Sequence, residues 1–186
     1  MAFLILGITF QTLLESNIKN IENKYFSFDT KYDYLFLLLF IFTFLQIAYG
    51  AFVSGTHSGL LFNTWPMYDG NILPFVENNN LRGIINFFET GEYIIFIHRT
   101  FALVILFLIV YINYIFVREN YKIKNNYLLL LFNITFIIQI LLGVLMTFKN
   151  IPWHLALAHQ GNAIILFLVS VSMWVFSKKS LQANLH

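Results

Sequence analysis

Four long runs of apolar residues constrain this chain more than any other feature of its sequence. Each run is about 20 residues or longer, which is the helical length that crosses a hydrocarbon core of ~30 Å. Leu, Ile and Phe dominate the runs, and Tyr or Trp stands at or near their ends, as is typical of membrane–water interfaces. The runs are Tyr34–Val53, Tyr93–Val117, Tyr127–Phe148 and Trp153–Phe176. We therefore predict an all-α membrane protein in which residues 34–176 form a four-helix transmembrane bundle built from two helix hairpins.

The composition excludes several classes of protein. With 59% hydrophobic and 11% charged residues, the chain is not a water-soluble enzyme. The absence of cysteine excludes disulfides, iron–sulfur clusters and thiolate-ligated haem, so any metal chemistry rests on the 5 histidines. The net charge of +2 comes from lysines beside the apolar runs, which is a membrane-orientation signal and not a nucleic-acid-binding surface.

The distribution of positive charge predicts the orientation of the spans, because Lys and Arg near helix ends are retained on the cytoplasmic or matrix side. Eight of the 11 Lys and Arg residues lie in 15–33, between the second and third spans, or in the tail 177–186. Arg82 and Lys149 lie on the opposite side. We predict a multi-pass protein of a bacterial inner (plasma) membrane, or of the mitochondrial inner membrane, with 15–33 and 177–186 on the cytoplasmic or matrix side.

Two segments outside the four spans have their own patterns. Residues 1–14 are apolar, but they are too short for a full span and lack the charged lead-in of a signal peptide. We predict a partial transmembrane helix there, with an interfacial helix as the alternative. The outer loop 54–92 begins with many turn-forming residues and should be irregular. Its second part predicts a short amphipathic helix from Leu81, Ile84, Ile85 and Phe88.

Two histidines lie inside the spans at matching depth. His98 follows Tyr93 by five residues and His159 follows Trp153 by six, which places them ~7.5 and ~9 Å below the outer boundary. An alanine stands one turn after each histidine and leaves space for a flat ring. Because ionisable residues inside a span are costly and by default indicate function, we predict that both imidazoles ligate one haem iron. Such a haem has no open axial site and suits electron transfer; two structural, hydrogen-bonded histidines are the alternative.

Other polar residues have weaker claims to this site. Arg99 either pairs with a haem propionate or snorkels to the interface. His154 is expected at the interface, His57 in the solvated outer loop, and His186 at the chain terminus. The remaining polar residues of the spans are uncharged and scattered along the sequence, which disfavours a proton pump or ion channel. These residues are Gln46, Asn113, Asn133, Gln139 and Asn162.

A short motif is repeated in the first and third spans. The sequence QIxxG occurs at Gln46–Gly50 and again at Gln139–Gly143, and the span after each copy carries one of the two histidines. The repeat predicts two related hairpins about a pseudo-two-fold axis along the membrane normal, which would place a single cofactor on the axis. We expect the two glycines to allow close packing near the outer ends.

Three segments together resemble the second half of haem A synthase, the inner-membrane enzyme that oxidises the C8 methyl group of haem O to the formyl group of haem A. The segments are QIAYGAFVSGTHSGLLFNTWPMYDGNILP, FIHRTFA and QILLGVLMTFKNIPWHLALAHQGNA. The resemblance covers residues 35 to about 176, and residues 1–14 are similar to the end of the family's fourth helix.

The resemblance implies an eight-helix protein with two similar halves, of which the first binds haem O and the second holds a bis-histidine haem b. His98 in FIHRT and His159 in ALAHQ match the haem b ligands. The substrate half of the family carries ExxH on its inward helix, whereas position 95 here is Ile, so we expect no catalytic residue of the hydroxylation site in this chain. The implied partners are the membrane, a separate N-terminal half and haem O synthase.

Two other functions remain open on the residues alone. A stand-alone membrane b-type cytochrome would use the same pair of histidines, although this chain has ligands for only one haem, near the outer face. A non-catalytic assembly subunit would need no cofactor. Haem stoichiometry separates the second alternative from the haem-binding functions.

Overall fold

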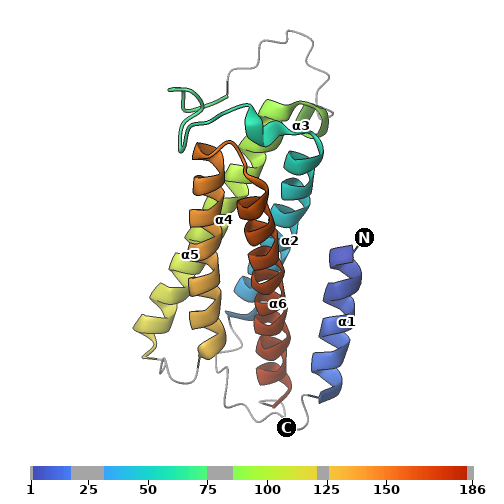
Figure 1. The fold of residues 1–186 in the computed structure, drawn as a ribbon. Helices are drawn as coiled ribbons and strands as arrows, with labels where there is room; N and C mark the ends of the chain where they lie inside the picture. The colour runs from blue at the N-terminus through green and yellow to red at the C-terminus, as the bar shows by residue number, and fades with distance from the viewer. Residues whose placement is uncertain (1, 18–31, 75–85, 121–125, 184–186) are drawn as a thin grey trace. The chain divides into compact units, whose positions relative to one another are not determined.

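The computed structural model describes residues 2–17, 32–74, 86–120 and 126–183 of the chain (Figure 1). Helices account for most of these residues, and no strand occurs among them apart from an isolated bridge between Tyr68 and Asn71. The elements are α1 (Ala2–Asn17), α2 (Asp33–Gly55), η3 (Ser58–Leu60), α3 (Asn86–Glu89), α4 (Gly91–Arg118), α5 (Tyr127–Phe148) and α6 (Trp153–Ala183). The prediction of an all-α protein is confirmed.

The four predicted spans correspond to α2, α4, α5 and α6, each long and apolar enough to cross a membrane. Helix α5 has the predicted bounds, and α2 and α4 differ from theirs by one or two residues at each end. Two helices continue past their predicted ends: α1 runs to Asn17 and α6 runs to Ala183. The polar residues that follow each apolar run still permit helix, so hydropathy alone sets these two boundaries too early.

The chain divides into two compact units, each of which takes part of all four long helices. Unit 1 contains residues 1–43, 105–137 and 164–186, and unit 2 contains 44–104 and 138–163. The QIxxG motifs, both span histidines and the outer loop all belong to unit 2. The functional site can therefore be described within that unit.

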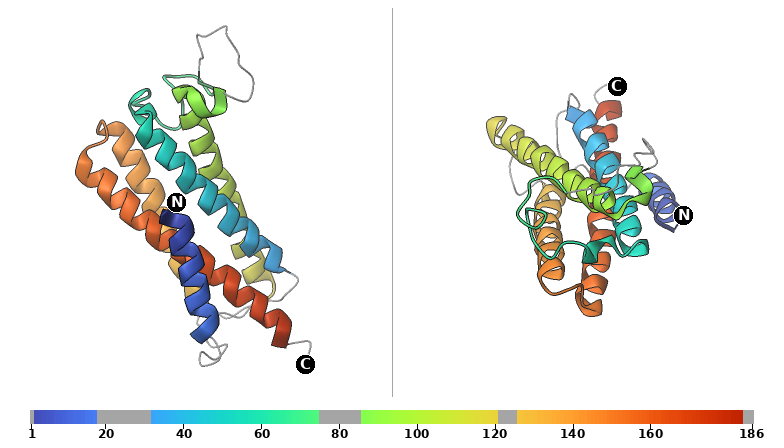
Figure 2. Two further views of the ribbon diagram at one scale, coloured as in Figure 1. Left: turned by 90° about the vertical axis from the view of Figure 1, so that its right-hand side faces the viewer. Right: turned by 90° about the horizontal axis from the view of Figure 1, so that it is seen from above.

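In unit 1, α1 lies beside the second half of α6 (Figure 2). The rings of Phe3 and Phe167 meet edge to face with centroids 5.7 Å apart. A Cβ atom at Gly7 would lie only 2.9 Å from the Phe167 ring, so the absence of a side chain there permits this approach. Phe167 also packs against Phe40 of α2, which in turn stacks on Trp174 at 5.2 Å. Aromatic rings thus link α1, α2 and α6.

A reciprocal pair of amides joins α4 to α5 in the same unit. Asn113 Nδ2 donates to Asn133 Oδ1 over 3.0 Å, and Asn133 Nδ2 donates to Asn113 Oδ1 over 2.9 Å. Each amide therefore satisfies the other where no water is available. Interhelical hydrogen bonds of this kind stabilise membrane bundles modestly.

In unit 2, the outer loop is irregular where the structure describes it, as predicted. Its first turn is η3, whose Ser58 is buried. A Cβ at Gly59 would meet the Ile151 side chain at 2.6 Å, so the loop packs closely on the turn before α6. Of the predicted amphipathic helix, Leu81, Ile84 and Ile85 lie outside the described residues, and Phe88 lies in the short helix α3 with a ring contact to Tyr49.

The amide pair yields the first prediction. Asn113→Ala should lower the unfolding free energy of the chain in detergent by about 1 kcal/mol, because it leaves the Asn133 amide without its partner. Thermal unfolding followed by circular dichroism measures the change. Replacing both residues with Leu should recover part of the loss, since no polar group is then left unpaired. If the double variant is less stable than Asn113→Ala, the amide pair contributes more to the unfolding free energy than the hydrogen bonds that each amide provides for the other.

Candidate haem-ligand site

The two span histidines occupy equivalent places on helices of the same unit. His98 is the eighth residue of α4 and His159 is the seventh residue of α6. The turn before α6 contains Asn150 and Ile151 with positive φ, and the Pro152 carbonyl accepts the first hydrogen bonds of the helix. This turn fixes where α6 begins and therefore the height of His159.

His98 contacts the first QIxxG motif. The amide nitrogen of Gln46 lies 3.3 Å from His98 Nε2. Four residues further along α2, Gly50 faces the other edge of the ring, where a Cβ would lie 3.2 Å from Cε1 and 3.8 Å from Nδ1. The glutamine therefore binds one nitrogen of the imidazole, while the glycine lets the ring approach the helix.

His159 contacts the second motif in the same way. The amide nitrogen of Gln139 lies 3.0 Å from His159 Nε2. A Cβ at Gly143 would lie 3.3 Å from Cε1 and 3.8 Å from Nδ1 of this ring. We call each set of glutamine, glycine and histidine a module. The predicted internal repeat therefore extends to the contacts of the two imidazoles.

The amide nitrogens that face the two rings correspond to one tautomer of each neutral imidazole. An amide nitrogen can donate a hydrogen bond but cannot accept one, so each Nε2 accepts through its lone pair. In a neutral imidazole the proton then resides on Nδ1. Both Nδ1 atoms are buried and have no hydrogen-bond partner in the structure. Each ring therefore directs towards a glutamine the Nε2 lone pair that a metal ion would take.

The surroundings of the two modules differ at the position three residues after each histidine. Asn162, three residues after His159, donates from Nδ2 to Gln139 Oε1 over 2.7 Å. The residue three after His98 is Phe101, whose ring packs on Tyr49. Gln46 Oε1 is consequently buried without a hydrogen-bond partner. Both polar atoms of the Gln139 amide are therefore hydrogen-bonded, whereas only the nitrogen of the Gln46 amide is.

Arg99 connects α4 to the outer loop. Its guanidinium donates to the carbonyl of Thr64 over 3.0 Å and to that of Met67 over 3.3 Å. It also lies over the ring of Tyr68, 4.6 Å from the centroid. Burial raises the pKa of the Tyr68 phenol, and the charge of Arg99 offsets part of that rise. Arg99 therefore clamps the loop directly beside His98.

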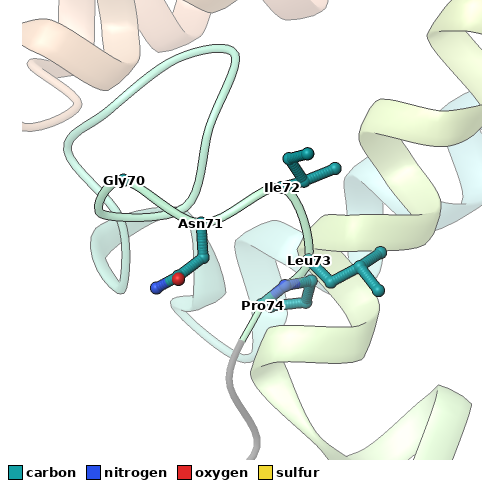
Figure 3. Close-up of a pocket in the computed structure, with 5 residues that line it drawn as sticks. All are labelled: Gly70, Asn71, Ile72, Leu73 and Pro74. Atoms are coloured by element: carbon teal, nitrogen blue, oxygen red, sulfur yellow. The ribbon is translucent and has the colours of Figure 1, made fainter.

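Beyond this clamp, the loop turns back on itself and exposes apolar side chains. The Thr64 hydroxyl oxygen accepts a hydrogen bond from the Asp69 backbone amide over 2.8 Å. Residues Gly70–Pro74 line an open hollow of about 480 Å³ (Figure 3). Ile72 is 82% exposed and Leu73 62%. No residue of this hollow carries a charge, and it is separate from the histidine modules.

The remaining histidines lie elsewhere. His154 is exposed and its ring meets Trp153 edge to face at 5.9 Å. His57 is exposed in the loop with a positive φ of 55°. His186 lies outside the described residues. Within the parts of the chain that the structure describes, no group of three or more His, Cys, Asp or Glu side chains is placed to hold a metal ion. A bis-imidazole site uses two protein ligands only.

Sequence reasoning missed the partners of the histidines. Gln46, Gln139 and Asn162 are not scattered, as the sequence suggested, but contact the imidazoles directly or through one another. The signal was present in the QIxxG repeat, because the motif places a polar and a small residue one turn apart before each histidine-bearing span. The two glycines serve the approach of the imidazole rings as well as helix packing.

Comparison with known proteins matches residues 1–171 to the family model described as cytochrome oxidase assembly protein. Heme A synthase of Wolbachia pipientis wMel is 40% identical over 157 residues, covering 82% of this chain and 41% of the relative. Heme A synthase of Bartonella henselae is 30% identical over 179 residues, covering 95% of this chain and 49% of the relative. The chain thus spans less than half the length of these curated relatives.

The clamp on the outer loop is testable without a cofactor. Arg99→Gln should speed hydrogen exchange at the Asp69 amide and its neighbours by about tenfold, because two hydrogen bonds to a charged group are lost. Hydrogen–deuterium exchange with mass spectrometry measures this. Arg118→Gln, at the far end of the same helix, serves as the control and should leave the loop unchanged. Equal exchange in both variants would show that Arg99 does not hold the loop.

Proposed function

This chain belongs to the cytochrome oxidase assembly protein family, and from that premise we propose that it is the haem b-binding, electron-transferring half of a haem A synthase. His98 and His159 would supply the two axial ligands. The complete enzyme would oxidise the C8 methyl group of haem O to give haem A, in the inner membrane of a bacterium. The activity, the substrate haem O and the partners are part of this proposal, because the chain covers under half of its relatives.

The observation that carries the proposal is the pair of matched modules in unit 2. The two imidazoles have matching surroundings. Each Nε2 accepts a hydrogen bond from a glutamine amide, and each Nδ1 is buried. A neutral imidazole is the form that binds iron, through the Nε2 lone pair that each glutamine amide now faces. The residues present therefore fit a haem held by two histidines. A haem held by these two histidines would supply electron transfer and would offer no open site for substrate.

The surrounding residues have supporting roles in this proposal. Gly50 and Gly143 let the rings lie close to α2 and α5. Ala102 and Ala163, one turn after the histidines, contribute little side-chain volume. Arg99 has five N–H donors, and two hydrogen bonds to loop carbonyls leave others available for a haem propionate. A cation on the outer side suits that acidic edge.

Optical spectroscopy tests haem binding directly. The chain purified in detergent should give the reduced-minus-oxidised spectrum of a low-spin b-type haem. His98→Ala and His159→Ala should each abolish that low-spin spectrum, because either change removes an axial ligand. His154→Ala is the matched control on α6 and should leave the spectrum intact. A wild-type chain that binds no haem would rule out the electron-transfer role and favour a non-catalytic assembly subunit.

Co-expression tests the place of this chain in the whole reaction. Cells making haem O together with this chain and a four-helix partner that carries ExxH should accumulate haem A. Either protein alone should leave haem O unconverted, since we place the hydroxylation site in the partner. Extraction of the haems and chromatography measure the conversion. Conversion by this chain alone would contradict the division of labour, whereas haem binding with no conversion in the pair would favour a stand-alone cytochrome.

A further inference from the structure

The glutamines occupy the nitrogen atoms that the proposed function requires for iron. Each Nε2 lone pair already accepts a hydrogen bond from Gln46 or Gln139. A lone pair cannot serve an amide donor and a metal at the same time. From this geometry, and resting on the proposed function, we infer that the two glutamines are place-holding residues that satisfy the histidines in the haem-free chain and thereby set its affinity for haem.

The direction of the effect follows from the balance of hydrogen bonds in the two states. In the haem-free chain, removal of a glutamine amide would leave Nε2 buried among apolar side chains without a partner. In the haem-bound chain, Nε2 loses nothing when the glutamine amide is removed, because its lone pair is already bonded to iron. The removal also eliminates an amide that would otherwise have to find new hydrogen-bond partners once haem is bound. Both contributions favour binding. Loss of the glutamine should therefore tighten haem binding and destabilise the haem-free chain.

The two sides should differ in strength because their hydrogen bonds differ. Gln139 donates over 3.0 Å and is anchored by Asn162 at 2.7 Å. Gln46 donates over 3.3 Å and its Oε1 has no hydrogen-bond partner in the structure. A better anchored amide competes more strongly for the lone pair. The His159 side is therefore the more strongly held of the two, and Asn162 contributes to it through Gln139.

A haem titration of the haem-free chain in detergent tests this inference. Gln139→Met keeps the side-chain length but removes the amide with its oxygen and its nitrogen, and it should lower the Kd for haem by about tenfold. Gln46→Met should lower it by about threefold. Thermal unfolding should show a lower Tm for both variants than for the wild type when no haem is present. Asn133→Ala is the control and should reduce the Tm without changing the Kd for haem.

A double-mutant cycle tests the role of Asn162. Asn162→Ala alone should tighten haem binding by about threefold, and it should have no further effect in the Gln139→Met background. An independent effect of Asn162→Ala in that background would contradict its action through Gln139. Gln139→Asn, whose shorter amide does not reach the ring, provides the same test should Gln139→Met fail to fold.

The outcomes separate the inference from the proposed function. Weaker or unchanged haem binding by Gln139→Met and Gln139→Asn, with normal binding by the wild type, would overturn the place-holding role and leave the haem site standing. The absence of haem binding in the wild type would overturn both. Tighter binding by both Gln139→Met and Gln139→Asn, together with a lower haem-free Tm, is the result that supports the inference, because a residue that only packs the bundle would lower the Tm without tightening the binding. Tighter binding by Gln139→Met alone would overturn the inference, because a Met thioether can itself ligate haem iron.

Discussion

Hydrogen bonding of polar side chains inside apolar helices is the constraint on which this structure depends. A polar group in hydrocarbon has no water to bond, so it must find a partner on a neighbouring helix. The four long helices meet this requirement in pairs: Gln46 with His98, Gln139 with His159, and Asn113 with Asn133. The same bonds that remove unsatisfied groups also fix the orientation of the two imidazoles, so packing and function share one set of contacts.

This arrangement is repeated in the two helix hairpins and gives the two histidines equivalent contacts. Each hairpin supplies a helix with a glutamine and a glycine, followed by a helix with a histidine. The product is two imidazoles in matching surroundings, which the proposed function would use as the two protein ligands of one haem iron. The outer loop adds asymmetry, because Arg99 ties Thr64 and Met67 to α4 beside His98, and the described contacts contain no equivalent clamp beside His159. A haem with its acidic edge towards that loop would use both features.

The sequence predicts the helices, and it singles out the two histidines by their depth, because both inferences rest on strong, local signals. Long apolar runs leave helix as the only structure that satisfies the backbone in lipid, and the depth of His98 and His159 follows from counting residues. The hydrogen-bond partners were not predictable from periodicity, since Gln46 and Asn162 resemble isolated polar residues until the facing helix is known. The ends of α1 and α6 were missed for a related reason: hydropathy marks where lipid ends, and a helix can continue beyond that point.

The proposed haem site requires two imidazole nitrogens from this chain on one iron atom. Pulsed electron paramagnetic resonance of the oxidised, haem-loaded chain, with histidine labelled by nitrogen-15, counts those nitrogens directly. We predict a low-spin ferric signal with couplings from two labelled imidazoles, reduced to one when either His98 or His159 is replaced. A high-spin signal, or coupling to only one histidine in the wild-type chain, would contradict the central claim.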